Sequence, residues 1–152
     1  MARETFDRTI EVSAGQDRAW AVLTDVEELA TWVGIIHSVT ENERLKSYTA
    51  VLEDRVGPFH LRADLTISVV VVEEGAEIHV EASGRDRAIN SKIDIVGDLR
   101  LAAQPAGGSQ VTVAGSYQIT GRAATMGASI VRRKGDLAVE QFFTRAAAAL
   151  NA

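Results

Sequence analysis

The sequence predicts an α+β fold in which a curved antiparallel sheet of six to seven strands wraps around one long C-terminal helix. Polar and apolar residues alternate with a period of two from residue 35 to about residue 119, which is typical of strands with one buried face. Short turn signals separate these strands, as in an antiparallel meander. The segment 122–150 contains neither proline nor a polar turn cluster and therefore predicts a helix.

The beginning of the chain predicts one strand followed by two short helices. Residues 4–13 alternate between polar and apolar, as a half-buried strand does. Ser13–Gln16 matches a capping box that starts the first helix, with Trp20 on its buried side. Asp25 is the expected cap of the second helix and Gly34 its expected end.

Six further strands are expected at about 35–41, 46–56, 59–72, 76–85, 92–102 and 111–119. Gly57-Pro58 supplies the turn between the second and third of these. A strand of about 14 residues would measure roughly 48 Å if it were flat, which is longer than most strands, so the sheet must curl. We expect the bends at Gly84, Gly97 and Gly115, which all fall on the inward face.

The C-terminal helix is predicted to measure roughly 43 Å and to present small residues to the sheet. Its inner stripe follows helical spacing: Gly127, Val131, Gly135, Ala138, Phe142, Ala146 and Leu150. Small residues either let a helix lie close to a sheet or leave empty volume beneath it, and the sequence leaves both alternatives open. A curled sheet facing a straight helix favours a pocket between them.

Composition sets the broad class of protein. With 152 residues, 46% of them apolar and 24% charged, the chain is expected to form a single domain over residues 1–152. The net charge of −5 disfavours nucleic acid as a partner. The absence of cysteine excludes disulfides and thiolate metal sites, and the three histidines lie too far apart to predict a metal centre.

Inward-facing positions give the candidate contacts to a ligand in this pocket. They are Trp32, Leu52, Leu61, Ala63, Leu65, Ile67, Ile78, Val80, Ile95, Gly97, Leu99, Tyr117, Ile119, Met126, Gly127, Ile130 and Val131.

Three polar residues also fall at inward positions. Tyr117 is the best candidate for a hydroxyl inside the cavity, and Arg8 and Asp54 are the ionisable exceptions on otherwise aliphatic faces. Arg8 and Asp54 can pair with each other, orient the head group of a ligand or act as an acid–base couple, or they can lie at strand ends that are wet. No catalytic residue is assigned.

The chain from Arg122 onward is net basic, whereas the part before it is acidic. Arg132, Arg133 and Lys134 are consecutive in the predicted helix, so at least one of them must face solvent. They form either a solvated face or a contact with anionic lipid or an acidic partner.

Nothing in the sequence predicts export or a membrane span. The first twelve residues, MARETFDRTIEV, lack the apolar core of a signal peptide, and the longest apolar run, Val69–Val72, is too short for a bilayer. We expect a cytoplasmic protein that can lie peripherally on the cytoplasmic face of the membrane.

Several local strings, in this order along the chain, resemble a known family. They are Trp20–Asp25, Leu29-Ala30, Val56–Phe59, Met126-Gly127, Leu137-Ala138 and Gln141–Phe143. The chain resembles the helix-grip (START-like, SRPBCC) superfamily and, within it, the family of the carbon monoxide dehydrogenase G-type accessory proteins.

The resemblance implies a non-enzymatic accessory protein of a CO dehydrogenase-type molybdenum hydroxylase. Such a protein would hold an apolar, lipid-like ligand such as a quinone in its cavity, need no other cofactor, and link the enzyme to the membrane. An alternative is a polyketide cyclase or dehydratase that uses the same cavity, with Arg8, Asp54 or Tyr117 converging in it. A third alternative is an adaptor with a fully packed interior.

Overall fold

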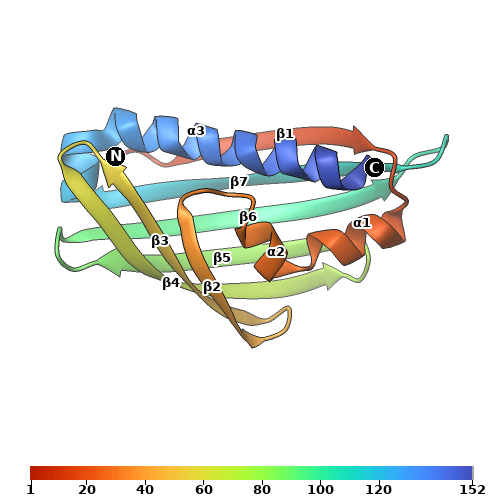
Figure 1. Ribbon diagram of the computed structural model, residues 1–152, viewed down its shortest axis with the longest axis horizontal. Helices are drawn as coiled ribbons and strands as arrows, with labels where there is room; N and C mark the ends of the chain where they lie inside the picture. The colour runs from red at the N-terminus through yellow and green to blue at the C-terminus, as the bar shows by residue number, and fades with distance from the viewer. Residues whose placement is uncertain (152) are drawn as a thin grey trace.

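A seven-stranded antiparallel sheet curls around one long helix, as the sequence predicts (Figure 1). The computed structural model describes residues 1–151. The strands are β1 (Glu4–Val12), β2 (Ile36–Glu43), β3 (Ser47–Val56), β4 (Phe59–Glu73), β5 (Glu77–Asp86), β6 (Ser91–Ala103) and β7 (Ser109–Gly121). The helices are α1 (Gln16–Leu23), α2 (Val26–Ala30) and α3 (Arg122–Leu150). Every predicted element is present.

The strand order is β1-β7-β6-β5-β4-β3-β2, so the first two strands form opposite edges of the sheet. The chain between them, which contains α1 and α2, therefore passes from one edge to the other (Figure 1). From β2 to β7, neighbouring strands are consecutive in sequence and joined as hairpins. In the β3–β4 hairpin Val56 pairs with Phe59, and Gly57 takes the positive φ of 58° that this two-residue turn requires.

The start of α1 differs from the predicted capping box. Gly15 is the N-cap, and Ser13 instead donates its hydroxyl to the carbonyl of Leu150. The Ser13 amide also donates to Asn151 Oδ1 at 2.8 Å, and the Gln16 side chain donates to Gly75. These side chains join α1 to the end of α3 and to the β4–β5 turn rather than closing a local box. The Asp25 cap of α2 is confirmed, because its side chain accepts the Glu28 amide.

Helix α3 has the predicted bounds but is broken near its beginning. Gly127 has φ −144° and ψ 24°, which are not helical values. A side chain at Gly127 would lie 2.7 Å from Val56 Cγ1, so the helix approaches the β3–β4 hairpin very closely at this point. The break changes the direction of the first turn relative to the rest of the helix (Figure 1).

The apolar interior consists of separate clusters rather than one continuous core. One lies under the first half of α3 against β3, β4, β6 and β7 and includes Leu61, Ile93 and Val131. A second joins α1 and the second half of α3 to β1 and the ends of β6 and β7. A smaller third cluster surrounds Tyr48.

On the outer face of the sheet, His79 lies between two carboxylates. Its Nδ1 is 2.7 Å from Asp98 Oδ1 and its Nε2 is 3.4 Å from Glu81 Oε1. The hydrogen bonds to Asp98 and Glu81 raise the pKa of His79 above its usual value, against the opposing effect of burial.

This raised pKa predicts a pH-dependent contribution to stability. Because the folded-state pKa exceeds the unfolded value of about 6.5, the contribution is fully present below that pH and is lost as pH rises through the folded pKa. We expect His79→Gln to lower the free energy of unfolding more at pH 5.5 than at pH 8.5, by about 1 kcal/mol or less. Urea unfolding measures the difference, which should largely disappear in an Asp98→Asn background. Equal losses at both pH values would contradict the prediction.

Candidate functional site

A cavity of about 340 Å³ lies between the sheet and α3. This volume is at the lower end of the range of small-molecule sites. The side chains that line it come from β1 and from β3 to β7, from the α2–β2 connection and from α3: Phe6, Val33, Ile35, Ile36, Leu52, Asp54, Val56, Leu61, Leu65, Ile67, Val80, Ala82, Ile93, Ile95, Val113, Tyr117, Ile119, Val131, Lys134, Gly135, Ala138, Val139, Phe142 and Phe143. The interior is therefore not fully packed.

Small residues on both walls explain why this volume is empty. On β5, Ala82 lies between Ile67 of β4 and Ile95 of β6 and leaves a depression in the floor. On α3, Gly135 and Ala138 face the cavity where a helix on a sheet usually carries larger apolar residues. Both alternatives for the small-residue stripe are thus realised, because Gly127 permits a close approach and Ala138 borders empty space.

The structure places about half of the predicted ligand contacts on the cavity wall. These are Leu52, Leu61, Leu65, Ile67, Val80, Ile95, Tyr117, Ile119 and Val131. They are the inward positions of β3 to β7 together with the first full turn of α3 after its break. Their contact with a ligand stays a prediction.

The remaining predicted contacts do not line the cavity: Trp32, Ala63, Ile78, Gly97, Leu99, Met126, Gly127 and Ile130. Met126 is 59% exposed because it precedes the break at Gly127. Trp32 lies beyond the end of α2 and packs against Phe142, with 5.6 Å between the ring centroids.

The other exclusions follow from packing. Ile78 belongs to the cluster around Tyr48, and Leu99 packs against the second and third clusters. Ala63 is fully buried within the first cluster, and Ile130 contacts the β3–β4 turn at Gly57. Gly97 has no side chain to reach the cavity.

Asp54 and Lys134 form an ion pair on the cavity wall. Lys134 Nζ lies 3.2 Å from Asp54 Oδ1 and 3.1 Å from Oδ2, so the contact joins α3 to β3. Lys134 is therefore not part of the exposed basic surface that the sequence predicts. Arg8 pairs with Glu140 and lies over the ring of Phe143 instead, so the suggested Arg8–Asp54 couple is not formed.

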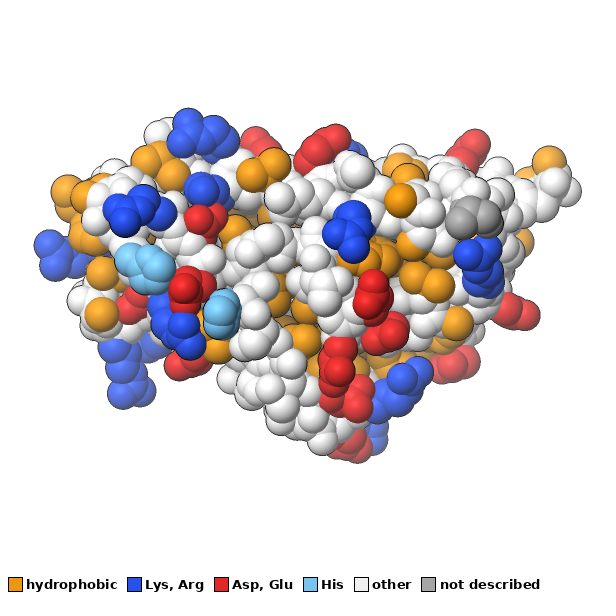
Figure 2. Space-filling view, in the orientation of Figure 1, with side chains coloured by type: hydrophobic (Ala, Val, Ile, Leu, Met, Phe, Trp, Pro, Cys, Tyr) orange, Lys and Arg blue, Asp and Glu red, His pale blue; other side chains and the backbone are white. Residues whose placement is uncertain are grey.

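The mouth of the cavity lies between α3 and the segment that leads into β2. Apolar side chains are visible in the hollow between these elements (Figure 2). Two contacts cross this gap: the Lys134–Asp54 pair, and a hydrogen bond of 3.0 Å from the Gly34 amide to Gln141 Oε1. Lys134 and Gln141 are two helical turns apart, which is roughly 10 Å. Val33, Ile35 and Ile36 form one side of this window and are only half-buried.

The Tyr117 hydroxyl is the third polar group on the wall. It lies directly beneath α3, because a Cβ added at Gly135 would be 2.2 Å from it. Burial, followed by the negative charges of Asp136 and Glu4, raises the pKa of Tyr117, so the hydroxyl remains protonated at neutral pH. The prediction that Tyr117 places a hydroxyl at the cavity agrees with this position.

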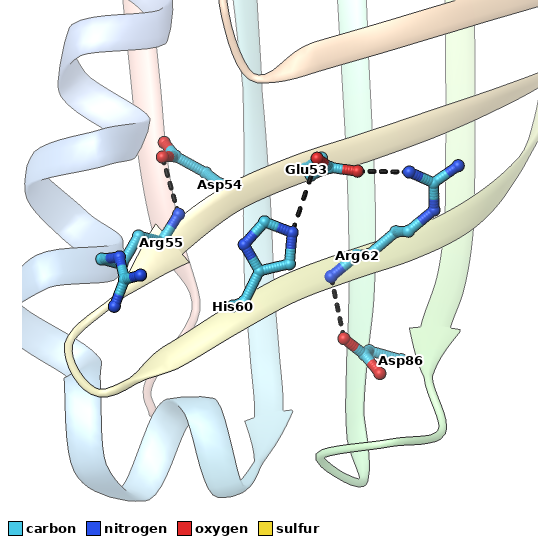
Figure 3. A network of polar contacts seen from close by, with 6 residues as sticks. All are labelled: Glu53, Asp54, Arg55, His60, Arg62 and Asp86. Carbon is cyan, nitrogen blue, oxygen red and sulfur yellow. Dashed lines mark hydrogen bonds and ion pairs between the residues drawn. The ribbon is translucent and has the colours of Figure 1, made fainter.

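A separate polar network occupies the opposite face of the same strands. Glu53 pairs with Arg62 and His60, while its neighbour Asp54 projects toward α3 (Figure 3). Partial burial raises the pKa of Glu53, but the hydrogen bond and charge of Arg62 and the nearby histidines outweigh it and hold the pKa below its usual value. The main-chain amide of Arg62 donates to buried Asp86, which also accepts the amide of Ala88. These contacts fix the hairpins and are remote from the cavity.

A curled sheet that grips a long helix over an apolar cavity defines the molecule as a START-like, helix-grip protein. A START superfamily protein from Mycobacterium smegmatis has a TM-score of 0.68 at 10% identity, with 96% of each chain covered. The family model of CoxG, the G-type component of carbon monoxide dehydrogenase, matches residues 9–151, and the chain therefore belongs to the CoxG family.

Other solved structures share the fold at low sequence identity. A conserved protein from Geobacillus kaustophilus has a TM-score of 0.79 at 17% identity, with 97% of this chain and 95% of that chain covered. The Zhui aromatase/cyclase from Streptomyces sp. R1128 has a TM-score of 0.64 at 15% identity, with 98% and 92% covered. No protein with a curated function matches the chain significantly in sequence.

Proposed function

We propose that this chain is a single ligand-binding domain that carries an apolar, lipid-like molecule, most simply a quinone, for a CO dehydrogenase-type molybdenum enzyme. The observation that carries the proposal is the cavity beneath α3, whose wall is aliphatic and aromatic except at Tyr117, Asp54 and Lys134. Membership of the CoxG family supplies the class of partner. An apolar cavity protects such a molecule from water during transfer.

We further propose that the protein works at the cytoplasmic face of the membrane. Arg133 and Leu137 are one turn apart on the outer side of α3, and Leu137 is 51% exposed. Exposed Met126 lies near the beginning of the same helix, whereas Arg132 is 3.9 Å from Glu4. Basic and apolar side chains on one face favour weak binding to anionic lipid, about 1 kcal/mol for each cation. Within residues 1–151, no helix is long and apolar enough to cross a membrane.

The proposal predicts that the freshly purified protein retains a lipid-like molecule. We expect native mass spectrometry to show a mass increase that disappears on denaturation, and organic extraction to yield a quinone in near-equimolar amount. Protein purified empty should take up added quinone with one-to-one stoichiometry. A protein that is empty and also fails to bind added quinone would refute the carrier function.

A polyketide cyclase-like enzyme is the second candidate, because Tyr117 and Asp54 both border the cavity and an aromatase/cyclase shares the fold. Its general acid or base would be one of these two groups. Incubation with a poly-β-keto thioester separates the candidates: an enzyme forms a cyclised product at a rate that falls in Tyr117→Phe, whereas a carrier forms none.

A further inference from the structure

The cavity wall is polar at only one place. Lys134 and Gly135 are consecutive on α3; the first holds Asp54, and the second lies over the Tyr117 hydroxyl. Every other lining residue among the described residues is apolar. One turn of the helix therefore brings two hydrogen-bond donors to the cavity, close to its mouth, while the other side chains of the wall offer none.

The Tyr117 hydroxyl has an unused donor. Within residues 1–151 it forms no hydrogen bond, although its surroundings keep it protonated. A hydroxyl in apolar surroundings without an acceptor costs free energy that a bound acceptor would recover. Lys134 has three ammonium protons, and the Asp54 carboxylate does not use all of them. Both groups can donate to an oxygen of a ligand.

The charge at this place selects the kind of oxygen. Asp54 already neutralises Lys134, so an incoming carboxylate would gain little from the ammonium and would be repelled by Asp54. A neutral carbonyl carries no such penalty and accepts hydrogen bonds from both donors. The pair therefore disfavours fatty acids and favours uncharged carbonyl compounds.

We infer that the ligand is an uncharged amphiphile whose carbonyl end is held by Tyr117 and Lys134 beside the mouth, with its apolar remainder along the wall of the cavity. The inference rests on the proposed carrier function and names the chemical class that the site selects. It also places the carbonyl end, rather than the tail, next to the opening between α3 and Ile35–Ile36.

Three probes test the inference by calorimetric titration. They are a 2-methyl-1,4-naphthoquinone with one isoprenoid unit, the corresponding naphthalene without ring oxygens, and laurate. We expect the wild-type protein to bind the quinone about five- to tenfold more tightly than the naphthalene, as one or two net hydrogen bonds allow, and laurate most weakly. Tyr117→Phe should lose about fivefold for the quinone and leave binding of the naphthalene unchanged.

Variants at the ion pair complete the test. Lys134→Met should weaken the quinone selectively, and the charge-balanced double variant Asp54→Asn/Lys134→Met should do the same without an unpaired carboxylate. Arg133→Met removes one exposed cation from the adjacent position and should change neither probe. Equal losses for quinone and naphthalene, no loss for either, or preferential binding of laurate would overturn the inference while leaving the carrier function standing. Failure of the wild-type protein to bind either aromatic probe would overturn both.

Discussion

Replacing Ala82 by phenylalanine is expected to abolish measurable binding of the naphthoquinone probe, with a loss of at least about tenfold in affinity. Ala82 lies on the floor of the cavity between Ile67 and Ile95, where an aromatic ring would occupy the space that we assign to the ligand. The cavity measures only about 340 Å³, so one ring removes a large part of it. Calorimetric titration measures the loss.

The same substitution should leave the fold intact. The added ring enters empty volume instead of displacing packed side chains, so we expect the free energy of unfolding to change by less than about 2 kcal/mol. Ala102→Phe is the matched control, because it adds the same ring at an exposed position of β6 and should leave binding unchanged. Unaltered binding in Ala82→Phe would show that the probe occupies another site.

The predictable part of this molecule is the part with a regular period. Alternation identifies all seven strands and places Leu52, Leu65 and Tyr117 on the concave face, because side chains in a strand must alternate between its two faces. The bounds of α3 are equally accessible, since no residue in that segment breaks a helix outright. The fold class follows from these elements and their order.

The cavity mouth is not predictable in the same way. Val33–Ile36 lie in a connection without any period, so their position depends on tertiary packing. Met126 faces the cavity only in a continuous helix, and the break at Gly127 turns it outward. Lys134 resembles its basic neighbours in sequence, although it lies three residues after buried Val131 and so shares much of its face. That spacing is the signal for its inward position.

Ser13 and the inward glycines illustrate a second limit. The pattern from Ser13 to Gln16 satisfies a local rule, but the hydroxyl finds its partner at Leu150, which no local pattern reveals. Likewise Gly97 and Gly115 look equivalent in sequence, since both interrupt an inward-facing apolar row. Only the separation of the strands around each one distinguishes a position that needs glycine from one that tolerates a side chain.

This distinction leads to the largest expected effect on stability. Gly97 of β6 and Gly115 of β7 are paired directly across the two strands, and neither has a positive φ. A Cβ at Gly115 would lie 2.2 Å from the carbonyl oxygen of Val96 and 2.9 Å from a ring carbon of Phe6. A Cβ at Gly97 would meet nothing closer than 3.9 Å. The two sites therefore both lie outside the left-handed region and differ in the space available.

We expect Gly115→Ala to lower the free energy of unfolding by at least about 3 kcal/mol, because main-chain atoms of two central strands must separate to admit the methyl group. Gly97→Ala should change stability by less than about 1 kcal/mol, and the smaller entropy of its unfolded chain favours a slight gain. Urea unfolding of both variants beside the wild-type protein measures the difference. Equal effects at the two positions would mean that the loss of glycine entropy, and not the close approach of β6 and β7, governs this part of the sheet.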